Sequence, residues 1–282
     1  MIRTVTRQPD DRLPRRSERR LLVLDQFRRK PFLTVGELSE TLGVSSITVR
    51  RDLRQLADEG LVRHEHGGAL LVTGPPVAVF HQRETARVTE KKAIGLIAAR
   101  QVNGGEVVGL DSGTTALAVA QALHPPERLT VVTHSLPAIV ELASRANVEV
   151  IGLGGLLQER TLAFAGPAVT AALRTLRLHT LFLAATGCTF ESGMTCVSLL
   201  EADTKRAFIE AAQRVVLVAD SSKFGRVFPT RVAALDVVHE VITDAGLPDS
   251  ISRDLEAAGI RVHRADPATG TDTAGDDDEK TE

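Results

Sequence analysis

Short polar loops in the C-terminal part of the chain carry the residue types that bind small anions. Each loop follows an apolar run rich in β-branched residues: Asp111-Ser112-Gly113-Thr114-Thr115 follows VVGL, and Asp220-Ser221-Ser222-Lys223 follows RVVLVA. Backbone amides and hydroxyls at the start of a helix can hold an anion, and a lysine adds a cation. A polar loop after a strand is commonly only a turn, so a binding site requires several such loops that lie together.

The elements that would position these loops alternate along the chain from about Phe80. Strand-like runs such as LTVVT, VEVIG and TLFLAA alternate with helical patterns such as KKAIGLIAARQV and LPAIVELA. This alternation predicts an α/β domain, with a mostly parallel sheet covered by helices on both faces. Ligands of such folds bind at the carboxyl ends of the strands. Five polar loops are expected to meet there: Asp111–Thr115, Thr133–Ser135, Gly152–Gly155, Thr186-Gly187 and Asp220–Lys223. That convergence favours a small polar, phosphorylated ligand.

A second group of candidate residues lies on the pattern SITVRRDLRQLADEG, which begins at Ser46. Val49, Leu53 and Leu56 recur at helical spacing and predict a buried stripe. The polar residues lie off that stripe: Ser46, Thr48, Arg50, Arg51, Arg54 and Gln55. An arginine on such a face can bond guanine bidentately in the major groove, so the pattern is typical of a recognition helix.

The segments on either side support a winged helix-turn-helix. Thr34-Val35-Gly36-Glu37 is a capping box that opens a preceding helix, and Gly43-Val44-Ser45 is a tight turn before the next one. The run LVRHEHGGALLV predicts two short strands around a turn at Gly67-Gly68. An ordinary three-helix subdomain with a solvated arginine face is the structural alternative.

The charge of the chain is unevenly distributed. The formal net charge is −2, but residues 1–72 carry +4, residues 73–264 carry none and residues 265–282 carry −6. The average therefore conceals a basic N-terminal module that could meet nucleic acid. Aromatic residues are only 3% of the chain and all are Phe, which disfavours proteins that stack single-stranded bases.

The changes in charge and composition along the chain predict its domain organisation. We expect a flexible basic arm at 1–16, a winged helix-turn-helix at 17–72, a linker at 73–79 around Pro75-Pro76, an effector-sensing domain at 80–264 and a disordered acidic tail at 265–282. Cys188 and Cys196 are too few for a disulfide framework or a four-cysteine zinc site, and no apolar run is long enough for a membrane span. We therefore expect a cytoplasmic protein with no membrane partner.

The N-terminal motifs resemble the DNA-binding signature of the DeoR-type bacterial transcription regulators. Val44-Ser45, Thr48 to Leu53 and His66 to Ala69 match the family's recognition helix and wing, although Arg63 precedes His66 by three residues rather than two. The resemblance implies that Arg50 and Arg51 contact DNA and that Asp52 orients an arginine. Spacing and resemblance together give these expected contacts to double-stranded operator DNA: Ser45, Ser46, Thr48, Arg50, Arg51, Arg54, Arg63 and His66.

The C-terminal loops resemble the effector domain of the same family, which is similar to sugar-phosphate isomerases and coenzyme A transferases. Glu90-Lys91, Asp111 to Thr115, Gly154-Gly155 and Asp220 to Phe224 fit its pattern, whereas His134 stands where the family usually has Asn. The residues expected to contact the effector are Asp111, Ser112, Gly113, Thr114, Thr115, His134, Ser135, Gly154, Gly155, Thr186 and Lys223.

The resemblance to isomerases raises the question of catalysis. Related isomerases carry two Asp after the strand corresponding to TLFLAATG, but this chain has Ala184-Ala185-Thr186-Gly187-Cys188 there. Glu201 and Lys205 are one helical turn apart, which most simply predicts an ion pair on the surface. We therefore expect no catalytic residue and no cofactor. His64 and His66 lack a third ligand nearby, so we expect no metal site.

The combined prediction is a transcriptional repressor of carbohydrate metabolism genes. A phosphorylated sugar or related metabolite would change its affinity for DNA, and paired half-sites favour a homo-oligomer. One alternative is a sugar-phosphate isomerase or transferase fused to a DNA-binding module. Another is a metabolite-binding protein whose basic module contacts a second protein.

Overall fold

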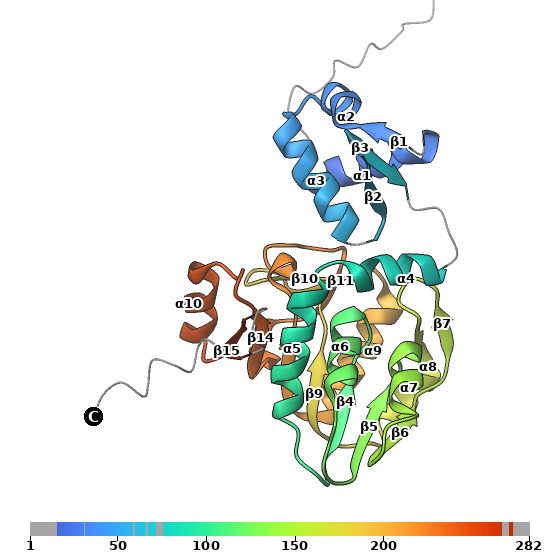
Figure 1. Ribbon diagram of the computed structural model, residues 1–282, viewed down its shortest axis with the longest axis vertical. Coiled ribbons are helices and arrows are strands. Elements are labelled where there is room, and N and C mark those ends of the chain that lie inside the picture. Colours follow the sequence, from blue (N-terminus) through green and yellow to red (C-terminus); the bar gives the residue numbers. More distant parts are fainter. Residues whose placement is uncertain are drawn as a thin grey trace, which may run out of the picture. The chain divides into compact units, whose positions relative to one another are not determined.

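The helices and strands of the chain belong to two separate groups. The computed structural model describes residues 16–30, 32–58, 60–65, 67–71, 76–266 and 271–272. These residues divide into two compact units with the boundary between Arg83 and Glu84, and each unit has its own hydrophobic core (Figure 1). We call them the N-terminal unit and the C-terminal unit.

The N-terminal unit is built from short helices and a three-stranded antiparallel sheet. Its elements are α1 (Arg16–Arg29), β1 (Phe32–Thr34), α2 (Val35–Leu42), α3 (Ser46–Asp58), β2 (Val62–Glu65) and β3 (Gly68–Leu71). The predicted stripe of Val49, Leu53 and Leu56 is buried, and it packs in one cluster with Phe27 of α1. The predicted helix-turn-helix and β-hairpin are both confirmed.

Strand β1 was not expected from the sequence. It pairs with β3, which lies between β1 and β2, so that Leu33 stands opposite Ala69. A three-residue strand shows no periodic pattern, and its partner is more than thirty residues further along the chain. The contact is tight, because a Cβ on Gly68 would lie 2.2 Å from the carbonyl oxygen of Leu33.

Part of the predicted linker is helical. Helix α4 (Pro76–Thr85) begins inside it and continues across the boundary between the two units. We expected the two consecutive prolines to end any regular element. A proline at the first helical position loses no hydrogen bond, however, because the amide there has no partner within the helix. Pro76 therefore starts a helix, and the predicted domain start at Phe80 lies within it.

The C-terminal unit contains one large sheet in which every strand pairing is parallel. Its strands are β4 (Val107–Leu110), β5 (Leu129–Thr133), β6 (Val148–Gly152), β9 (Leu178–Leu183), β12 (Ala212–Val218), β14 (Glu240–Asp244) and β15 (Arg261–Ala265). Their spatial order is β15-β14-β12-β9-β4-β5-β6. Strands β4 to β6 extend the sheet in one direction and β9 to β15 extend it in the other. The strand order thus reverses between β4 and β9.

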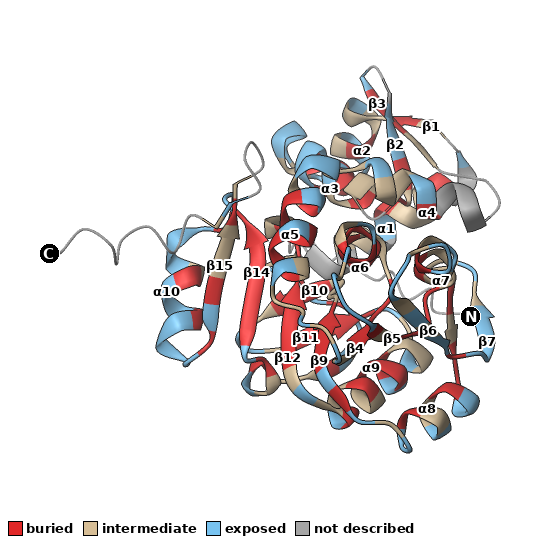
Figure 2. Ribbon diagram, turned by 60° about the horizontal axis from the view of Figure 1, so that its bottom comes forward, coloured by how far each residue is buried: buried red, intermediate tan, exposed pale blue. Residues whose placement is uncertain are grey.

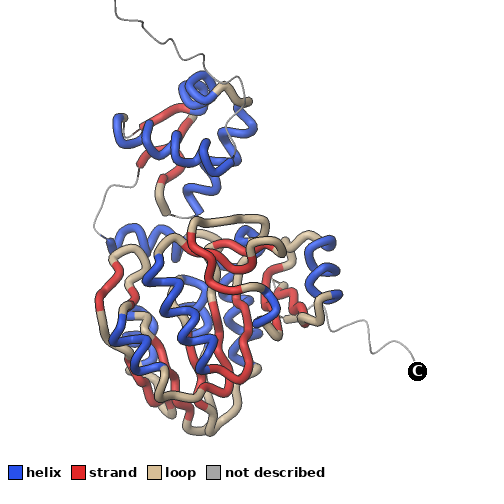
Figure 3. The backbone as a smooth tube through the Cα atoms, turned by 180° about the vertical axis from the view of Figure 1, so that it is seen from behind, coloured by secondary structure: helices blue, strands red, loops and turns tan. Residues whose placement is uncertain are grey.

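Helices cover both faces of this sheet, as the alternating pattern predicted. They are α5 (Val88–Arg100), α6 (Thr114–Ala122), α7 (Leu136–Leu142), α8 (Pro167–Leu173), α9 (Leu199–Ala211) and α10 (Asp249–Ala257). Helices α5, α6 and α7 lie on one face and α8 and α9 on the other, while α10 packs beside β15 (Figures 2 and 3). The central strands are therefore buried on both sides.

Smaller elements at the ends of the main strands were not expected. Strands β7 (Leu156–Gln158) and β8 (Ala163–Ala165) form one antiparallel pair. Strands β10 (Gly187–Thr189), β11 (Gly193–Cys196) and β13 (Thr230–Ala233) form another small antiparallel sheet, and two short 3-10 helices lie at Ser221–Lys223 and Leu235–Val237. These strands are too short to show an alternating pattern, and their partners decide their conformation.

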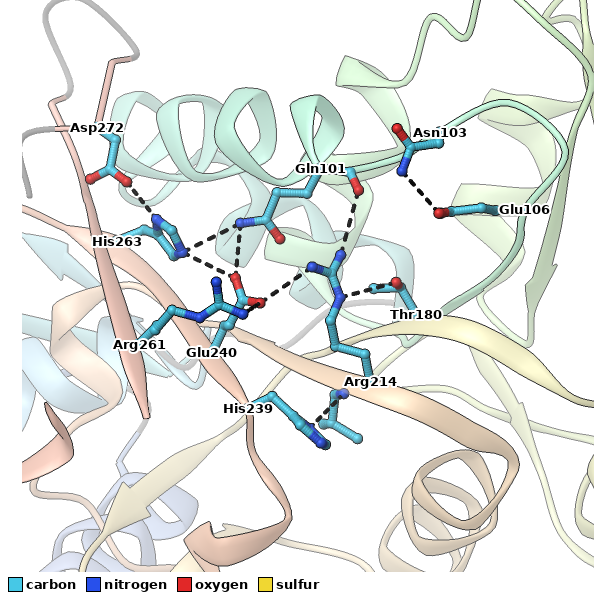
Figure 4. A network of polar contacts seen from close by, with 11 residues as sticks. Gln101, Asn103, Glu106, Thr180, Arg214, His239, Glu240, Arg261, His263 and Asp272 are labelled. Carbon is cyan, nitrogen blue, oxygen red and sulfur yellow. Dashed lines mark hydrogen bonds and ion pairs between the residues drawn. The ribbon is translucent and has the colours of Figure 1, made fainter. Parts of the chain in front are cut away.

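A buried carboxylate joins the elements at the amino ends of the strands (Figure 4). Glu240 of β14 is 2% exposed, and its Oε1 accepts hydrogen bonds from Arg214 of β12 at 3.2 Å and Arg261 of β15 at 2.9 Å. Its Oε2 lies 3.3 Å from Nε2 of Gln101, at the end of α5, and 3.1 Å from Nε2 of His263. A buried charge needs several such partners, and here they connect four elements.

The first residue of the predicted acidic tail belongs to the large sheet. Ala265 is the last residue of β15 and bridges to Asp272, whose carboxylate also contacts Nδ1 of His263 (Figure 4). Residues 267–270 and 273–282 of the predicted tail, and residues 1–15 of the predicted arm, lie outside the described part of the chain. Among the described residues, no helix combines the length and apolar character needed to cross a membrane.

The close approach of α5 and α6 gives a first prediction. Gly95→Ala adds a better helix former, worth about 1 kcal/mol on an exposed helix. It should nevertheless destabilise the C-terminal unit by about 1–3 kcal/mol, because the new Cβ would lie 2.5 Å from the carbonyl oxygen of Ala118. Urea unfolding followed by circular dichroism measures the change.

The matched control is Gly36→Ala on α2, where the nearest atom to the new Cβ is 3.9 Å away. That variant should keep or raise the stability of the chain. If both alanine variants gave the same gain, the close helix contact at Gly95 would be refuted.

Candidate functional site

The helix-turn-helix is held by capping interactions that the sequence predicted. The Thr34 hydroxyl accepts from the Glu37 amide at 3.2 Å, and Glu37 Oε2 accepts from the Thr34 amide at 2.8 Å. Hydrogen bonds from Lys30 and Thr34 lower the pKa of Glu37 to about 2, so the cap is charged at neutral pH. Gly43 ends α2 with φ of 65°, a left-handed conformation that glycine adopts without strain.

Helix α3 has opposite buried and exposed faces. Val49, Leu53 and Leu56 are each 1% exposed, while the side chains of Arg50, Arg51 and Arg54 lie in solvent. Ser46 is also exposed and Thr48 is half-buried. Ser45 caps the helix, since its hydroxyl accepts from the Thr48 amide at 3.3 Å. The structure thus brings the predicted polar residues of α3 together on one accessible face.

Asp52 is the exception on this helix, because it points into the protein. It is 7% exposed and forms an ion pair with Arg19 of α1, whose Nη2 lies 3.1 Å from Oδ1. Asp52 does orient an arginine, as expected, and that arginine is Arg19. This ion pair joins α1 to α3.

A concavity of about 530 Å³ lies between α3 and the β2–β3 hairpin. Its lining includes Arg50 and Arg54 of α3 together with His64, Gly67 and Gly68 of the hairpin. His64 is exposed and is not among the DNA contacts expected from the sequence. Arg63 is also exposed on β2, whereas His66 lies outside the described residues.

In the C-terminal unit, the predicted loops all follow the carboxyl ends of parallel strands. The Asp111–Thr115 loop follows β4 and Thr186 follows β9, so these two loops flank the point where the strand order reverses. His134-Ser135 follows β5, Gly154-Gly155 follows the edge strand β6, and Lys223 follows β12. A crevice at such a reversal is where open α/β sheets bind their ligands.

The carboxylate of Asp111 is completely enclosed at this point. Its Oδ2 forms an ion pair with Lys205 of α9 and accepts the Ala184 amide at 2.9 Å, while Oδ1 faces Nε2 of His134 at 3.1 Å. The other ring nitrogen of His134 lies 2.6 Å from the carbonyl oxygen of Phe164, so the ring connects Asp111 to β8. Asp111 therefore joins the ends of β4, β5 and β9 to α9.

The charges in this cluster stabilise one another. Burial by itself would raise the pKa of Asp111, but the positive charge of Lys205 and the hydrogen bond from His134 outweigh it and lower that pKa below its ordinary value. Burial likewise disfavours the charged form of Lys205, yet Asp111 and Glu201 raise its pKa above the ordinary value. The pair is thus fully ionised at neutral pH.

Two expectations about this cluster need correction. Lys205 is not part of a surface pair, because it is 3% exposed and its main partner is Asp111, with Glu201 at 3.7 Å. Asp111 was expected to contact the effector. It is 0% exposed and its oxygens already have three partners, so it positions the loop instead. Sequence separation hid this contact, since Asp111 and Lys205 are 94 residues apart.

The remaining predicted residues differ in exposure. Ser112 and Thr115 are buried, Gly113 and Thr114 are half-buried, and Thr186 is half-buried. Ser135 is buried and its hydroxyl caps α7. Gly154 and Gly155 are exposed, and a Cβ on Gly155 would lie 2.7 Å from the carbonyl oxygen of Ala165. Gly155 thus allows β7 and β8 to pack closely.

A second charged cluster lies at the carboxyl end of β12. Asp220 is 0% exposed, with Lys223 and Arg87 each 3.7 Å from its carboxylate. Lys223, Ser222, Lys91 and Arg87 together outweigh the effect of burial and lower its pKa. Arg87 and Lys91 belong to the start of α5 and were absent from the predicted contacts. We call Arg87, Lys91 and Lys223 the cationic corner.

Comparison with known proteins identifies the family. Residues 86–245 match the DeoR C terminal sensor domain, and residues 19–74 match the DeoR-like helix-turn-helix domain. The chain belongs to the DeoR family. It is therefore a transcriptional regulator with an N-terminal DNA-binding domain and a C-terminal sensor domain, as the motifs predicted.

Relatives of this DeoR-family regulator align with both of its units. It is 37% identical over 253 residues to the HTH-type transcriptional regulator GlpR of Haloferax volcanii, which covers 89% of this chain and 97% of that one. It is 32% identical over 240 residues to the glycerol-3-phosphate regulon repressor of Escherichia coli, covering 85% and 95%. Its likeness to ribose 5-phosphate isomerase A of Neisseria gonorrhoeae is distant, with 18% identity, a TM-score of 0.36 and coverage of 48% and 52%.

The ion pair in the sensor domain of this DeoR-family regulator gives a second prediction. Lys205→Met should lower the free energy of unfolding by about 3–5 kcal/mol, because it leaves the enclosed carboxylate of Asp111 without its cation. Adding Asp111→Asn should restore most of the loss. The chain has no Trp or Tyr, so circular dichroism in urea is the suitable measurement.

The pH dependence of the same variants checks the assignment. The pKa of Asp111 is lowered from 3.8, so its stabilising effect is complete above that value and disappears as the pH falls below it. The stability difference between the wild type and the double variant should therefore shrink at acid pH. Equal losses in the single and double variants would show that the two side chains do not act as a pair.

Proposed function

We propose that this protein is a repressor of carbohydrate metabolism genes whose affinity for operator DNA is changed by a phosphorylated sugar or related metabolite. Helix α3 lies in the major groove in this proposal, and the metabolite binds at the carboxyl ends of the strands of the C-terminal unit. The operator contacts are Ser45, Ser46, Thr48, Arg50, Arg51, Arg54, Arg63 and His66, with His64 added from the hairpin.

The arrangement of α3 supports the DNA-binding part of the proposal. Its three exposed arginines lie opposite a fully buried stripe, so the helix can enter a groove without disturbing the core of the unit. The concavity beside Arg50 and Arg54 adds room for a phosphate backbone. Asp52 carries the only acidic side chain between Ser46 and Gln55, and its pairing with Arg19 keeps it away from this face.

The cationic corner is the observation that indicates which class of ligand binds. Arg87, Lys91 and Lys223 act on Asp220, and Glu90 lies 3.6 Å from Arg87, so two acidic side chains accompany three cations. The remaining positive charge lies at the ligand-binding edge of the sheet, next to the start of α5. A phosphate group fits this charge, and Thr186, which follows the adjacent strand β9, provides a hydroxyl for a sugar.

The name of one relative agrees with this ligand class. The Escherichia coli protein is a repressor of the glycerol-3-phosphate regulon, and glycerol 3-phosphate is a small phosphorylated polyol. Binding without turnover is the simplest function of the site. The loop after β9 has no carboxylate, and burial raises the pKa of the Cys188 thiol on that loop to about 12, so it is not a thiolate nucleophile.

Regulation requires more than ligand binding. The metabolite changes DNA affinity only if it binds one arrangement of the protein more tightly than another. A homo-oligomer that holds two half-sites provides such arrangements, because the spacing of the two recognition helices then controls affinity.

Effector titration is the third prediction. The full chain should bind a DNA fragment from its own promoter region, and the affinity should change with a phosphorylated sugar but not with its unphosphorylated form. Lys223→Met should weaken the response by about tenfold or more in effector concentration, since it removes a charge-assisted contact. Fluorescence anisotropy of labelled DNA measures both quantities.

Lys92→Met is the matched control, because Lys92 is exposed on α5 beside Lys91. It should leave the response unchanged. The ligand proposal fails if no sugar phosphate in a broad panel alters DNA affinity.

Loss of a base contact is the fourth prediction. Arg50→Ala should weaken operator binding by about 1–3 kcal/mol if Arg50 bonds a guanine bidentately. Arg128→Ala removes an exposed arginine of the C-terminal unit and should have no effect. Unchanged affinity in Arg50→Ala would exclude Arg50 from base recognition.

A further inference from the structure

One apolar side chain stands out on the exposed face of α3. Ile47 is 78% exposed, more than any other large apolar side chain in the described part of the chain. In the N-terminal unit the other described large apolar residue that is exposed is Leu22 of α1, at 45%. A single exposed apolar residue is common on protein surfaces, so its position has to decide whether it has a role.

The position of Ile47 places it among the expected DNA contacts. Ile47 is the second residue of α3, and Arg50, Arg51 and Arg54 follow it at spacings of three, four and seven residues. Residues at these spacings share one face of a helix. The first turns of a recognition helix are the part that contacts base edges. Ile47 therefore lies at the N-terminal end, which we call the leading end, of the face of α3 that carries the arginines.

Two hydroxyls close to Ile47 in the sequence, those of Ser45 and Thr48, are already engaged with each other. The Ser45 and Thr48 hydroxyl oxygens are 3.0 Å apart, and Ser45 also caps the helix through the Thr48 amide. Ile47 itself makes no buried contact that would explain its type, because three-quarters of its side chain is in solvent. The leading end of α3 thus offers an apolar surface to its partner, with cationic donors one turn behind.

We propose that Ile47 is a specificity-determining residue that recognises thymine in the operator by packing on its C5-methyl group. In the major groove thymine is the base that displays a methyl group, and apolar side chains contact it there. The inference rests on the proposed DNA-binding function. It predicts that operator affinity depends on one thymine methyl in each half-site.

The test removes that methyl without changing base pairing. The full-length chain selects a duplex from a random pool, and each thymine of the selected site is replaced in turn by deoxyuridine. At one position of the half-site the replacement should weaken wild-type binding about fourfold, the value for one methyl group removed from an apolar contact. Ile47→Ala should bind the unmodified duplex at least as weakly as the wild type binds the duplex with deoxyuridine at that position. The affinity of this variant should no longer change when thymine at that position is replaced by deoxyuridine.

Two controls separate recognition from folding. Ile47→Ala should keep the circular dichroism spectrum and unfolding midpoint of the wild type, since Ile47 is exposed and alanine favours a helix. Leu22→Ala should keep both the affinity and the methyl sensitivity.

The possible failures are distinguishable. If the chain selects no duplex from the pool, the proposed function fails and this inference with it. If the chain binds but no deoxyuridine replacement weakens it, Ile47 does not recognise thymine. If Ile47→Ala keeps the sensitivity of the wild type, another residue makes the methyl contact and the inference is likewise overturned.

Discussion

The ligand-binding edge of the C-terminal unit depends on the enclosed ion pair between Asp111 and Lys205. A carboxylate removed from water is strongly unfavourable unless cations and donors replace its hydration. Asp111 pairs with Lys205 of α9 and with His134, which follows β5, and it accepts a hydrogen bond from the Ala184 amide, which follows β9. These partners come from distant parts of the chain, so the ion pair can form only when the sheet is assembled, and it then fixes the loops where the strand order reverses.

The same physical arrangement recurs in both units. In the N-terminal unit Asp52 is buried against Arg19, and in the C-terminal unit Glu240 is buried among Arg214, Arg261 and His263. In each case an acidic side chain is satisfied internally and joins separate elements. Basic side chains that lack such a buried partner, such as Arg50 and Arg54, stay available for an anionic ligand. Neutralisation of acids in the interior thus leaves cationic surfaces where DNA and a phosphorylated metabolite are proposed to bind.

Much of the fold and part of the site could be predicted from local patterns. The capping box at Thr34, the stripe of Val49, Leu53 and Leu56, and the apolar strand runs all reflect interactions within a few residues of the chain. The short strands β1, β7, β8, β10, β11 and β13 could not be predicted, because three or four residues carry no clear period and their pairing partners are remote. The prolines at the linker were misinterpreted for a different reason, since Pro76 is compatible with the start of a helix.

By itself, the sequence determined that a basic helix-turn-helix precedes an α/β domain of the DeoR family, and which polar loops follow its strands. Only the tertiary structure decided how those polar residues are used. Asp111 and Lys205 proved to be buried partners, whereas Arg87 and Lys91 joined Lys223 at the cationic corner. The physical reason is that a charged residue's role depends on its burial and its neighbours, and both arise from contacts between segments that are far apart in the chain.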